Sequence, residues 1–234
     1  MGDSRTMRER RASVRDLFRT AGLYCLTDSQ NSRCTNVDAV RQMLEGGARI
    51  VQYREKGKNQ LAMYQDCLAI REMTKSCGAA FFVNDDIALA IAVSADGVHV
   101  GQDDLPVPIV RQLVGESMII GLSTHSPEQA QAAVQAGADY IGVGPVFFTR
   151  TKQDVGEPVG LSYVEYAAKN IELASVAIGG INSANAAEVI EHGADCVAMI
   201  SDIVSAADIE KQVRDVSAVI LATRSLLQSN RIRV

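Results

Sequence analysis

The sequence alternates between short hydrophobic runs and longer segments of helical periodicity, and this alternation restricts the chain to few folds. The short runs are rich in β-branched and aromatic residues, which favour strands, whereas the intervening segments repeat apolar residues at the spacing of an amphipathic helix. Eight strands are predicted, at Leu23–Thr27, Arg49–Arg54, Ala80–Asn84, Gly97–Gly101, Met118–Ser123, Tyr140–Gly144, Ser175–Ile178 and Cys196–Ile200. Regular alternation of this kind predicts an α/β fold with a parallel sheet.

A recurring phrase marks where a helix ends and the next strand begins. It reads E-G-G-A-R at 45–49, Q-A-G-A-D at 135–139 and E-H-G-A-D at 191–195. The glycine suits the left-handed residue that follows a helix, and the residues after it lead into a buried strand. Eight such units in 234 residues favour a single closed (β/α)8 TIM barrel over an open doubly wound sheet.

The chain is predicted to hold one domain, because no linker or low-complexity tract interrupts the alternation. Residues 1–21 form a basic N-terminal arm with a short helix, residues 22–228 the catalytic barrel, and residues 229–234 a C-terminal tail. The arm has no apolar core of a secretory signal. It either binds a partner or nucleic acid, or covers the fold through Val14, Leu17 and Phe18; we favour the second interpretation, because one basic turn is a weak signal.

Composition excludes several classes of partner. A formal net charge of -5 leaves no broad basic face for nucleic acid, and the apolar runs are too short to span a membrane. The five cysteines are scattered without a C-x-x-C pair, which is typical of reduced thiols in a cytoplasmic protein. We therefore expect a cytoplasmic protein without nucleic-acid or membrane partners, and a homo-oligomer is one option for its assembly.

Polar residues at the strand ends are the candidates for function, because TIM barrels carry their chemistry there. Gln52, Arg54 and Lys56 alternate at period two, so their side chains leave the strand on one face, toward the barrel interior. Burying two cations without partners costs on the order of several kcal/mol, which predicts an anionic ligand. The alternative is an internal ion pair with Glu55 or a neighbouring aspartate.

Two later strand ends predict a phosphate site. Gly179 and Gly180 follow the seventh strand and Ser201 follows the eighth, where barrels often bind phosphate through backbone N–H groups. Asn182 and Ser183 are candidate N-caps of the next helix. The glycine pair alone could equally form only a tight turn between strand and helix.

Asp85 and Asp104 follow neighbouring strands and form a candidate metal site. Two carboxylates beside several cations suit Mg²⁺, which binds one or two carboxylates together with phosphate oxygens and water. Either aspartate could instead be a helix N-cap. The three histidines lie on separate units, so we interpret them as structural residues or as residues that support a site from behind, and we predict no zinc site.

The motifs at these strand ends resemble those of the thiamine phosphate synthase family, in the family's order over residues 22–205. They are Q-Y-R-E-K at 52–56, V-N-D-D at 83–86, G-V-H-V-G-Q-D-D-L at 97–105, G-L-S-T-H at 121–125, G-P-V-F-F-T-R-T-K at 144–152 and A-I-G-G-I at 177–181. The resemblance implies a Mg²⁺-dependent transferase of thiamine biosynthesis with two phosphorylated small-molecule substrates. It would join 4-amino-5-hydroxymethyl-2-methylpyrimidine diphosphate to 4-methyl-5-(2-phosphooxyethyl)thiazole, or its carboxylated form, and release pyrophosphate.

The resemblance also implies roles for individual residues. The pyrimidine substrate would be held by Gln52, Tyr53, Arg54, Glu55, Lys56, Asn84 and Ser123. The thiazole phosphate would be held by Thr149, Arg150, Thr151, Gly179, Gly180, Ile200 and Ser201. Lys152 would hold the leaving pyrophosphate, Asp85 and Asp104 would bind Mg²⁺, and the catalytic set would be Arg54, Lys56, Ser123 and Lys152.

The implied reaction explains why cations dominate this set. An electron-rich aminopyrimidine can expel diphosphate to give a cation, so the protein must stabilise charge on the leaving group and hold the thiazole nitrogen nearby. That nitrogen carries no proton, so no strong general base is needed. The dissociative character comes from the resemblance. Three positions depart from the family's pattern: Phe148 replaces a proline, Tyr53 a leucine and Cys25 an aliphatic residue.

Two alternatives share the barrel. A thiazole phosphate tautomerase would keep the phosphate site but would need neither diphosphate nor Mg²⁺, and Asp85, Asp104 and Lys152 argue against it. A non-catalytic sensor of a phosphorylated ligand is the second, since fold does not prove activity. Two candidate metal carboxylates make the sensor the weaker interpretation.

Overall fold

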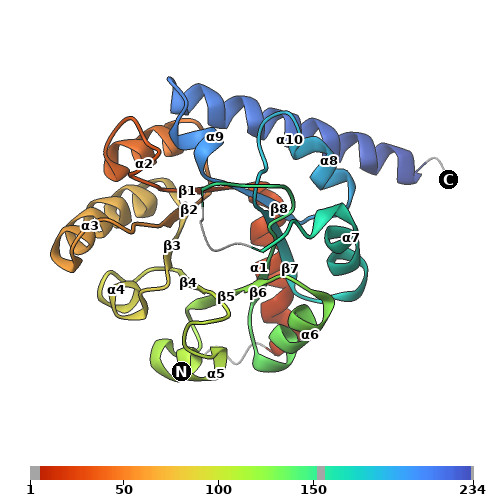
Figure 1. Cartoon of the computed structure of the whole chain (residues 1–234), viewed down its shortest axis with the longest axis horizontal. Coiled ribbons are helices and arrows are strands. Elements are labelled where there is room, and N and C mark those ends of the chain that lie inside the picture. Colours follow the sequence, from red (N-terminus) through yellow and green to blue (C-terminus); the bar gives the residue numbers. More distant parts are fainter. Residues whose placement is uncertain (1–5, 152–155, 233–234) are drawn as a thin grey trace.

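Eight parallel strands close into a barrel in the computed structural model of the chain, which describes residues 6–151 and 156–232 (Figure 1). Each strand pairs with the next along the chain, and β1 pairs with β8, so the predicted TIM barrel is confirmed. The strands are β1 (Leu23–Leu26), β2 (Ile50–Tyr53), β3 (Ala80–Asn84), β4 (Gly97–Val100), β5 (Ile119–Thr124), β6 (Tyr140–Val143), β7 (Ala174–Ile178) and β8 (Cys196–Met199).

Helices surround the barrel and separate consecutive strands (Figure 1). They are α1 (Met7–Ala21), α2 (Asn36–Glu45), α3 (Gln60–Cys77), α4 (Ile87–Ala92), α5 (Val107–Val114), α6 (Pro127–Ala136), α7 (Gly160–Asn170), α8 (Ala186–Glu191), α9 (Ser201–Val204) and α10 (Ile209–Ile232). Helix α10 continues to Ile232, into the segment assigned to a tail, and the boundaries of arm, barrel and tail stay a prediction. No helix of the described residues is long and apolar enough to cross a membrane.

The recurring phrase has one conformation in its three copies. Gly47, Gly137 and Gly193 have φ angles of 93°, 84° and 99°, the left-handed region that glycine adopts without a steric penalty. Each lies between a helix and the strand that follows it. The chain can therefore reverse within a few residues at these points and re-enter the barrel in parallel.

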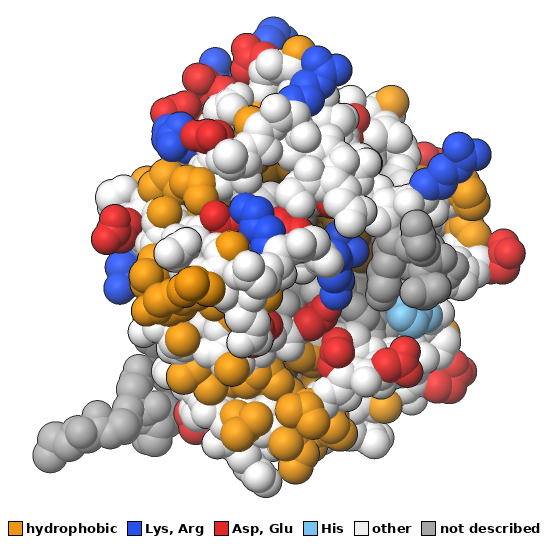
Figure 2. Space-filling model, turned by 60° about the vertical axis from the view of Figure 1, so that its left-hand side comes forward, with side chains coloured by type: hydrophobic (Ala, Val, Ile, Leu, Met, Phe, Trp, Pro, Cys, Tyr) orange, Lys and Arg blue, Asp and Glu red, His pale blue; other side chains and the backbone are white. Residues whose placement is uncertain are grey.

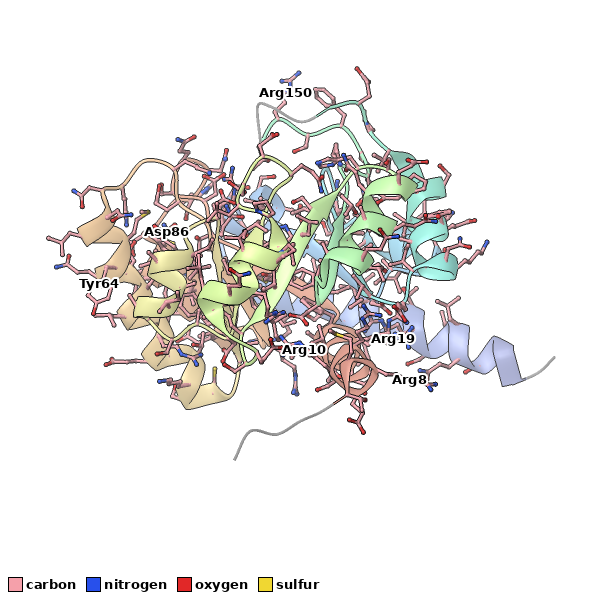
Figure 3. The ribbon with its side chains drawn as sticks, turned by 90° about the horizontal axis from the view of Figure 1, so that it is seen from below. Arg8, Arg10, Arg19, Tyr64, Asp86 and Arg150 are labelled. Atoms are coloured by element: carbon pink, nitrogen blue, oxygen red, sulfur yellow. The ribbon has the colours of Figure 1, made fainter. Side chains whose placement is uncertain are left out.

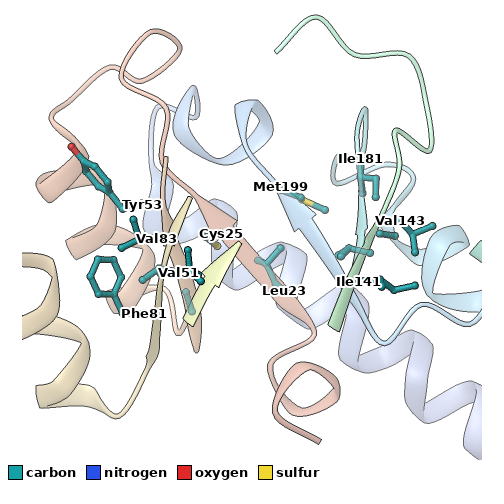
Figure 4. Packing of buried hydrophobic residues seen from close by; sticks show 14 of the residues in the cluster. Leu23, Cys25, Val51, Tyr53, Phe81, Val83, Ile141, Val143, Ile181 and Met199 are labelled. Carbon is teal, nitrogen blue, oxygen red and sulfur yellow. The ribbon is translucent and has the colours of Figure 1, made fainter. Parts of the chain in front are cut away.

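Two hydrophobic clusters lie on the two faces of the barrel wall. The larger one fills the space between strands and helices, and Figure 4 shows part of it, including Val51, Phe81 and Met199. The smaller one lies inside the barrel and includes Tyr24 and Phe82. This division follows from strand geometry, since successive side chains point to opposite faces.

Helix α1 packs across one end of the barrel, at the N-terminal ends of the strands. Val14 and Phe18 are buried there, and the ring centroid of Phe18 lies 4.5 Å from that of Tyr140 and 5.8 Å from that of Tyr24. The expected short N-terminal helix is therefore present. Its Phe18 packs against aromatic side chains of the strands and closes this end of the barrel, which leaves the opposite end for a site.

Three aspartates repeat one structural role at this closed end. Each stands immediately before an even-numbered strand, β4, β6 or β8, in the phrases S-A-D, G-A-D and G-A-D. The carboxylates of Asp96, Asp139 and Asp195 accept hydrogen bonds from the N–H groups of Phe81, Ile120 and Ser175, at 2.8, 2.8 and 3.0 Å. Each carboxylate thus satisfies a backbone donor near the start of the preceding strand.

The arginines of α1 are the partners of two of these carboxylates. Arg10 of α1 and Arg111 of α5 both pair with Asp139, whose carboxylate is 2% exposed. Arg19 pairs with Asp195 at 2.5 Å, and Figure 3 shows Arg10 and Arg19 at the end of the barrel opposite Arg150 (Figure 3). Four arginines of α1 thus contact the barrel or its loops: Arg10, Arg11, Arg15 and Arg19.

Hydrophobic side chains are exposed on the face formed by α3, α4 and α5. On the face shown in Figure 2 they gather below and to the left of a central group of basic and acidic side chains. They include Leu61, Leu68, Ile91, Ile109 and Leu113. Such surfaces are typical of contacts between proteins, and the homo-oligomer stays a prediction.

We expect Asp139→Ala to lower the free energy of unfolding by about 3 kcal/mol or more, because it leaves two half-buried guanidinium groups and the N–H of Ile120 without their partner. The control is Asp215→Ala, which removes an exposed pair with Lys211 and should cost less than about 1 kcal/mol. Urea unfolding followed by circular dichroism measures both. Equal small losses would contradict the structural role of Asp139.

Candidate active site

A cavity of about 830 Å³ opens at the C-terminal ends of the strands. Its size is that of sites for small molecules, and its position is that of TIM-barrel active sites. Thirteen of the residues predicted from the sequence line it: Gln52, Arg54, Lys56, Asn84, Asp85, Ser123, Thr149, Arg150, Thr151, Gly179, Gly180, Ile200 and Ser201. Lys152 lies outside the described residues.

The two cations after β2 both meet carboxylates. Lys56 Nζ donates to Asp85 Oδ2 at 2.8 Å, and Arg54 Nη1 lies 3.7 Å from Asp28 Oδ2. The alternative of an internal ion pair is therefore realised in part, although Glu55 is not the partner. The side chains of Lys56 and Asp85 are 52% and 34% exposed, so this pair is weak enough for an anionic ligand to rearrange it.

Asp85 has an unusual backbone conformation for a residue other than glycine. Its φ angle is 61°, and its N–H donates to the carbonyl of His99 at 2.8 Å. Left-handed conformations of such residues are strained and cluster at functional sites. The next residue, Asp86, is the N-cap of α4, because its Oδ1 accepts from the N–H of Leu89 at 2.8 Å. The two adjacent aspartates therefore have separate tasks, and Asp85 faces the cavity.

Asp104 lies apart from the residues that line the cavity. Its Oδ2 accepts a hydrogen bond from the N–H of Gly101 at 2.7 Å, which closes the turn after β4. Among the described residues, no three His, Cys, Asp or Glu side chains form a cluster that could hold a metal ion. A cation at this edge would need oxygen ligands from a bound molecule in addition to the carboxylate of Asp85.

Tyr53 and Glu55 point away from the cavity. The Tyr53 hydroxyl donates to Asp66 Oδ2 at 2.9 Å, and burial followed by the charge of Asp66 raises the pKa of Tyr53. Burial would raise the pKa of Glu55, but hydrogen bonds from Gly57, Ser29, Asn36 and the Lys56 N–H together lower it. Both residues bond to neighbouring parts of the protein at the end of β2, and their contacts with substrate stay a prediction.

The glycine turn after β7 packs against the loop that follows β6. The N–H groups of Val146 and Phe147 donate to the carbonyls of Ile178 and Gly179, both at 2.9 Å. Gly180 has a φ angle of 65°, and a Cβ there would lie 2.5 Å from the carbonyl oxygen of Phe148. The two glycines, Gly179 and Gly180, therefore form a turn and also allow the loops after β6 and β7 to contact each other.

Hydroxyl groups gather beside this turn. Thr151 Oγ1 donates to Ser201 Oγ at 3.4 Å, and Thr149 Oγ1 accepts from the N–H of Thr151 at 3.3 Å. Phe148, in the place of the family's proline, is 71% exposed, and the guanidinium of Arg150 lies 5.8 Å from its ring centroid. The end of this loop thus brings two threonines to the start of α9.

The N-caps predicted after the glycine pair are wrong. Helix α8 begins at Ala186 with Asn185 at the N-cap position. Asn182 Oδ1 instead accepts from the N–H of Ala184, and the N–H of Ser183 donates to Asp202. A turn therefore separates the glycine pair from the helix, because the asparagine side chain bonds the backbone two residues on.

The floor of the cavity contains residues that the sequence reasoning did not select. Tyr24, His99 and Tyr140 line it together with Gln52 and Ser123. Burial raises the pKa of Tyr24 and of Tyr140, so both hydroxyls keep their protons at neutral pH. The signal that could have found them is their inward register on strands whose other interior residues are apolar.

Fold and cavity define the class: a TIM-barrel protein with cations and a carboxylate on one side of the site and a glycine turn with hydroxyl groups on another. The chain belongs to the thiamine monophosphate synthase family, whose model matches residues 23–203.

Relatives with this name cover most of the chain. It is 56% identical to the thiamine-phosphate synthase of Pelotomaculum thermopropionicum over 80% of this chain and 85% of that protein. It is 50% identical to the Lawsonia intracellularis thiamine-phosphate synthase, over 86% and 93% of the two chains. A solved thiamine phosphate pyrophosphorylase from Pyrococcus furiosus superposes with a TM-score of 0.82 at 35% identity, covering 88% of this chain and 98% of that one.

We expect Gly180→Ala to destabilise the protein more than Gly47→Ala. Both glycines are left-handed, so each variant costs about 1–2 kcal/mol of backbone strain. Only at Gly180 does the new Cβ meet backbone atoms, which adds about 1–3 kcal/mol, since nothing lies within 4 Å at Gly47. Midpoints of urea unfolding measure the difference. Indistinguishable midpoints would show that the loop after β6 does not rest against the glycine turn.

Proposed function

We propose that this protein joins 4-amino-5-hydroxymethyl-2-methylpyrimidine diphosphate to 4-methyl-5-(2-phosphooxyethyl)thiazole, or to its carboxylated form with loss of carbon dioxide, and releases thiamine phosphate and pyrophosphate. The observation that carries the proposal is one cavity with two separate regions suited to anions, in a chain of this family. One region contains Arg54 and Lys56, and the other contains the glycine turn and its hydroxyl groups. Two phosphorylated substrates that react with each other need such an arrangement.

The cationic region is suited to the diphosphate. Negative charge grows on this group as its bond to carbon breaks, and fixed cations stabilise it most in that state. Arg54 and Lys56 supply two charges, and Asn84 supplies an amide donor on the neighbouring strand. Lys152, proposed on the family resemblance alone, would add a third charge.

A magnesium ion would be held on the same side, by Asp85 and the diphosphate oxygens. The donor set fits, because the half-exposed carboxylate of Asp85 lines the cavity and Mg²⁺ accepts one or two carboxylates with phosphate oxygens. When bound, the ion would neutralise charge on the leaving group. The family resemblance implies Asp104 as a second ligand, and its Oδ1 would be available while Oδ2 keeps the bond from the Gly101 N–H.

The second region is suited to the thiazole phosphate. Thr149, Thr151 and Ser201 offer hydroxyl groups, and the turn at Gly180 brings the backbone close without a side chain in the way. Bound there, the thiazole would be held with its nitrogen toward the pyrimidine. Orientation of this kind replaces a bimolecular encounter by a reaction within one complex.

The tautomerase alternative is not favoured. The relatives described above are named for the synthase, and a tautomerase would leave the Lys56–Asp85 pair and Arg54 without a task in the reaction. A non-catalytic sensor, the second alternative, would bind the phosphorylated compounds without converting them.

Incubating the purified protein with both substrates and Mg²⁺ should yield thiamine phosphate and pyrophosphate in equal amounts. Excess chelator should abolish the reaction, because Asp85 and two cations alone leave the diphosphate charge incompletely neutralised. Chromatographic detection of both products measures it, and added Mg²⁺ in excess of chelator is the control. Substrate binding without product would establish the sensor, and an unchanged rate in chelator would remove the metal from the proposal.

Variants on the two sides of the cavity should fail differently. Lys56→Ala removes a charge whose effect grows as the diphosphate leaves, so kcat should fall by about 10²-fold. Thr151→Ala removes a hydrogen bond present before and during reaction, so the KM for thiazole phosphate should rise by about tenfold with kcat little changed. Steady-state kinetics with each substrate varied separate the two. Equal effects of both variants on both substrates would show that the regions are assigned wrongly.

A further inference from the structure

We propose that a buried chain of hydrogen bonds, running from Gln52 through Tyr24, Tyr140 and His99 to Ser123, fixes which side of the cavity floor accepts a hydrogen bond and which side donates one. In this proposal Tyr24, Tyr140 and His99 are positioning residues that select the 4-aminopyrimidine. The inference rests on the proposed function and deepens it.

The hydrogen-bond chain joins five strands across the barrel interior. Gln52 Nε2 on β2 donates to the Tyr24 hydroxyl on β1 at 2.7 Å, and the hydroxyls of Tyr24 and Tyr140 lie 3.4 Å apart. The Tyr140 hydroxyl on β6 lies 2.9 Å from His99 Nδ1. His99 Nε2 on β4 lies 2.9 Å from Ser123 Oγ on β5. Both ends of the chain, Gln52 and Ser123, line the cavity.

The barrel leaves room for this chain where a side chain would otherwise block it. A Cβ on Gly121 would lie 2.1 Å from Cζ of Tyr140 and 2.5 Å from Nδ1 of His99, and a Cβ on Gly142 would lie 3.2 Å from Cε1 of His99. The tyrosine rings are held from below by Phe18 and Phe82. The hydroxyls therefore have little freedom to find other partners.

The proton order along the chain follows from its first bond. The Tyr24 hydroxyl accepts from Gln52, and its own buried proton needs an acceptor, for which the Tyr140 oxygen is in reach, so we assign Tyr24 as the donor to Tyr140. Tyr140 then donates to His99 Nδ1. A neutral imidazole that accepts at Nδ1 carries its proton on Nε2 and donates to Ser123, whose own proton is left for the cavity.

This order makes the two ends of the chain complementary. Gln52 uses one amide N–H on Tyr24, and we assign its carbonyl oxygen as the acceptor that faces the cavity. Ser123, which accepts from His99, is left to donate. A 4-aminopyrimidine offers an amino donor next to a ring-nitrogen acceptor, which matches. A 4-oxopyrimidine offers the opposite order, and a buried donor facing a donor is strongly disfavoured.

The direct test is ¹⁵N NMR of the imidazole nitrogens in the unliganded protein. The protein contains three histidines, so the variant His99→Asn identifies the signals of His99 by their loss. The proposal expects a neutral ring with its proton on Nε2 in the wild type, and a mixture of tautomers in Tyr140→Phe. A proton on Nδ1 in the wild type, or an unchanged spectrum in the variant, would overturn it. This outcome is independent of whether the protein makes thiamine phosphate.

The second test measures selectivity by competition of the 4-amino and 4-oxo forms of the pyrimidine diphosphate for the site. The wild type should prefer the 4-amino form, and Tyr140→Phe should reduce that preference by about tenfold, because the freed chain can reverse. The matched control is Tyr163→Phe, which loses a buried hydroxyl bonded to Thr124 Oγ1 at 2.7 Å and lies outside the chain. Equal preference in the wild type and Tyr140→Phe would overturn the proposal, as would an equal reduction in the control.

Discussion

The filling of the barrel interior is the constraint on which the rest of this structure depends. Eight strands enclose a space that must be packed with side chains at one end and left open at the other if the protein is to bind small molecules. Phe18, Tyr24, Phe82 and Tyr140 fill the closed end, and the ion pairs of Asp139 and Asp195 hold α1 beneath them. The aromatic layer therefore closes one end of the barrel and also forms the floor of the cavity.

Much of the fold could be predicted from the sequence, because its signals are local. Strand runs, left-handed glycines and the period-two register after the second strand each depend on neighbouring residues. The side chains in that register, Gln52, Arg54 and Lys56, line the cavity. The partner of Lys56 could not be predicted by the same means, since Asp85 lies 29 residues away and meets it only when β2 and β3 pair. The ion pairs of the α1 arginines could not be predicted either, because they depend on where α1 packs against the barrel.

Contacts between residues far apart in the sequence also explain why Tyr24 and Tyr140 are not predicted as site residues. Tyr24 and Tyr140 are 116 residues apart, and their contact exists only across a closed barrel. Tyr53 and Glu55 stand inside a motif, yet alternation along β2 turns Tyr53 toward α3, and Glu55, just after the strand, bonds to the loop before α2. Motif membership identified the strand end correctly, whereas the direction of each side chain required the register of the strand.

The central claim is that one cavity holds the two anionic groups on separate sides, the diphosphate by Arg54 and Lys56 and the thiazole phosphate by Thr151, Gly180 and Ser201. A crystal structure of the protein with thiamine phosphate, pyrophosphate and Mg²⁺ tests it most directly. We predict pyrophosphate in contact with Arg54 and Lys56, and the phosphate of thiamine phosphate against the glycine turn and the hydroxyls of Thr151 and Ser201. The reverse placement, or both groups on one side, would contradict the account.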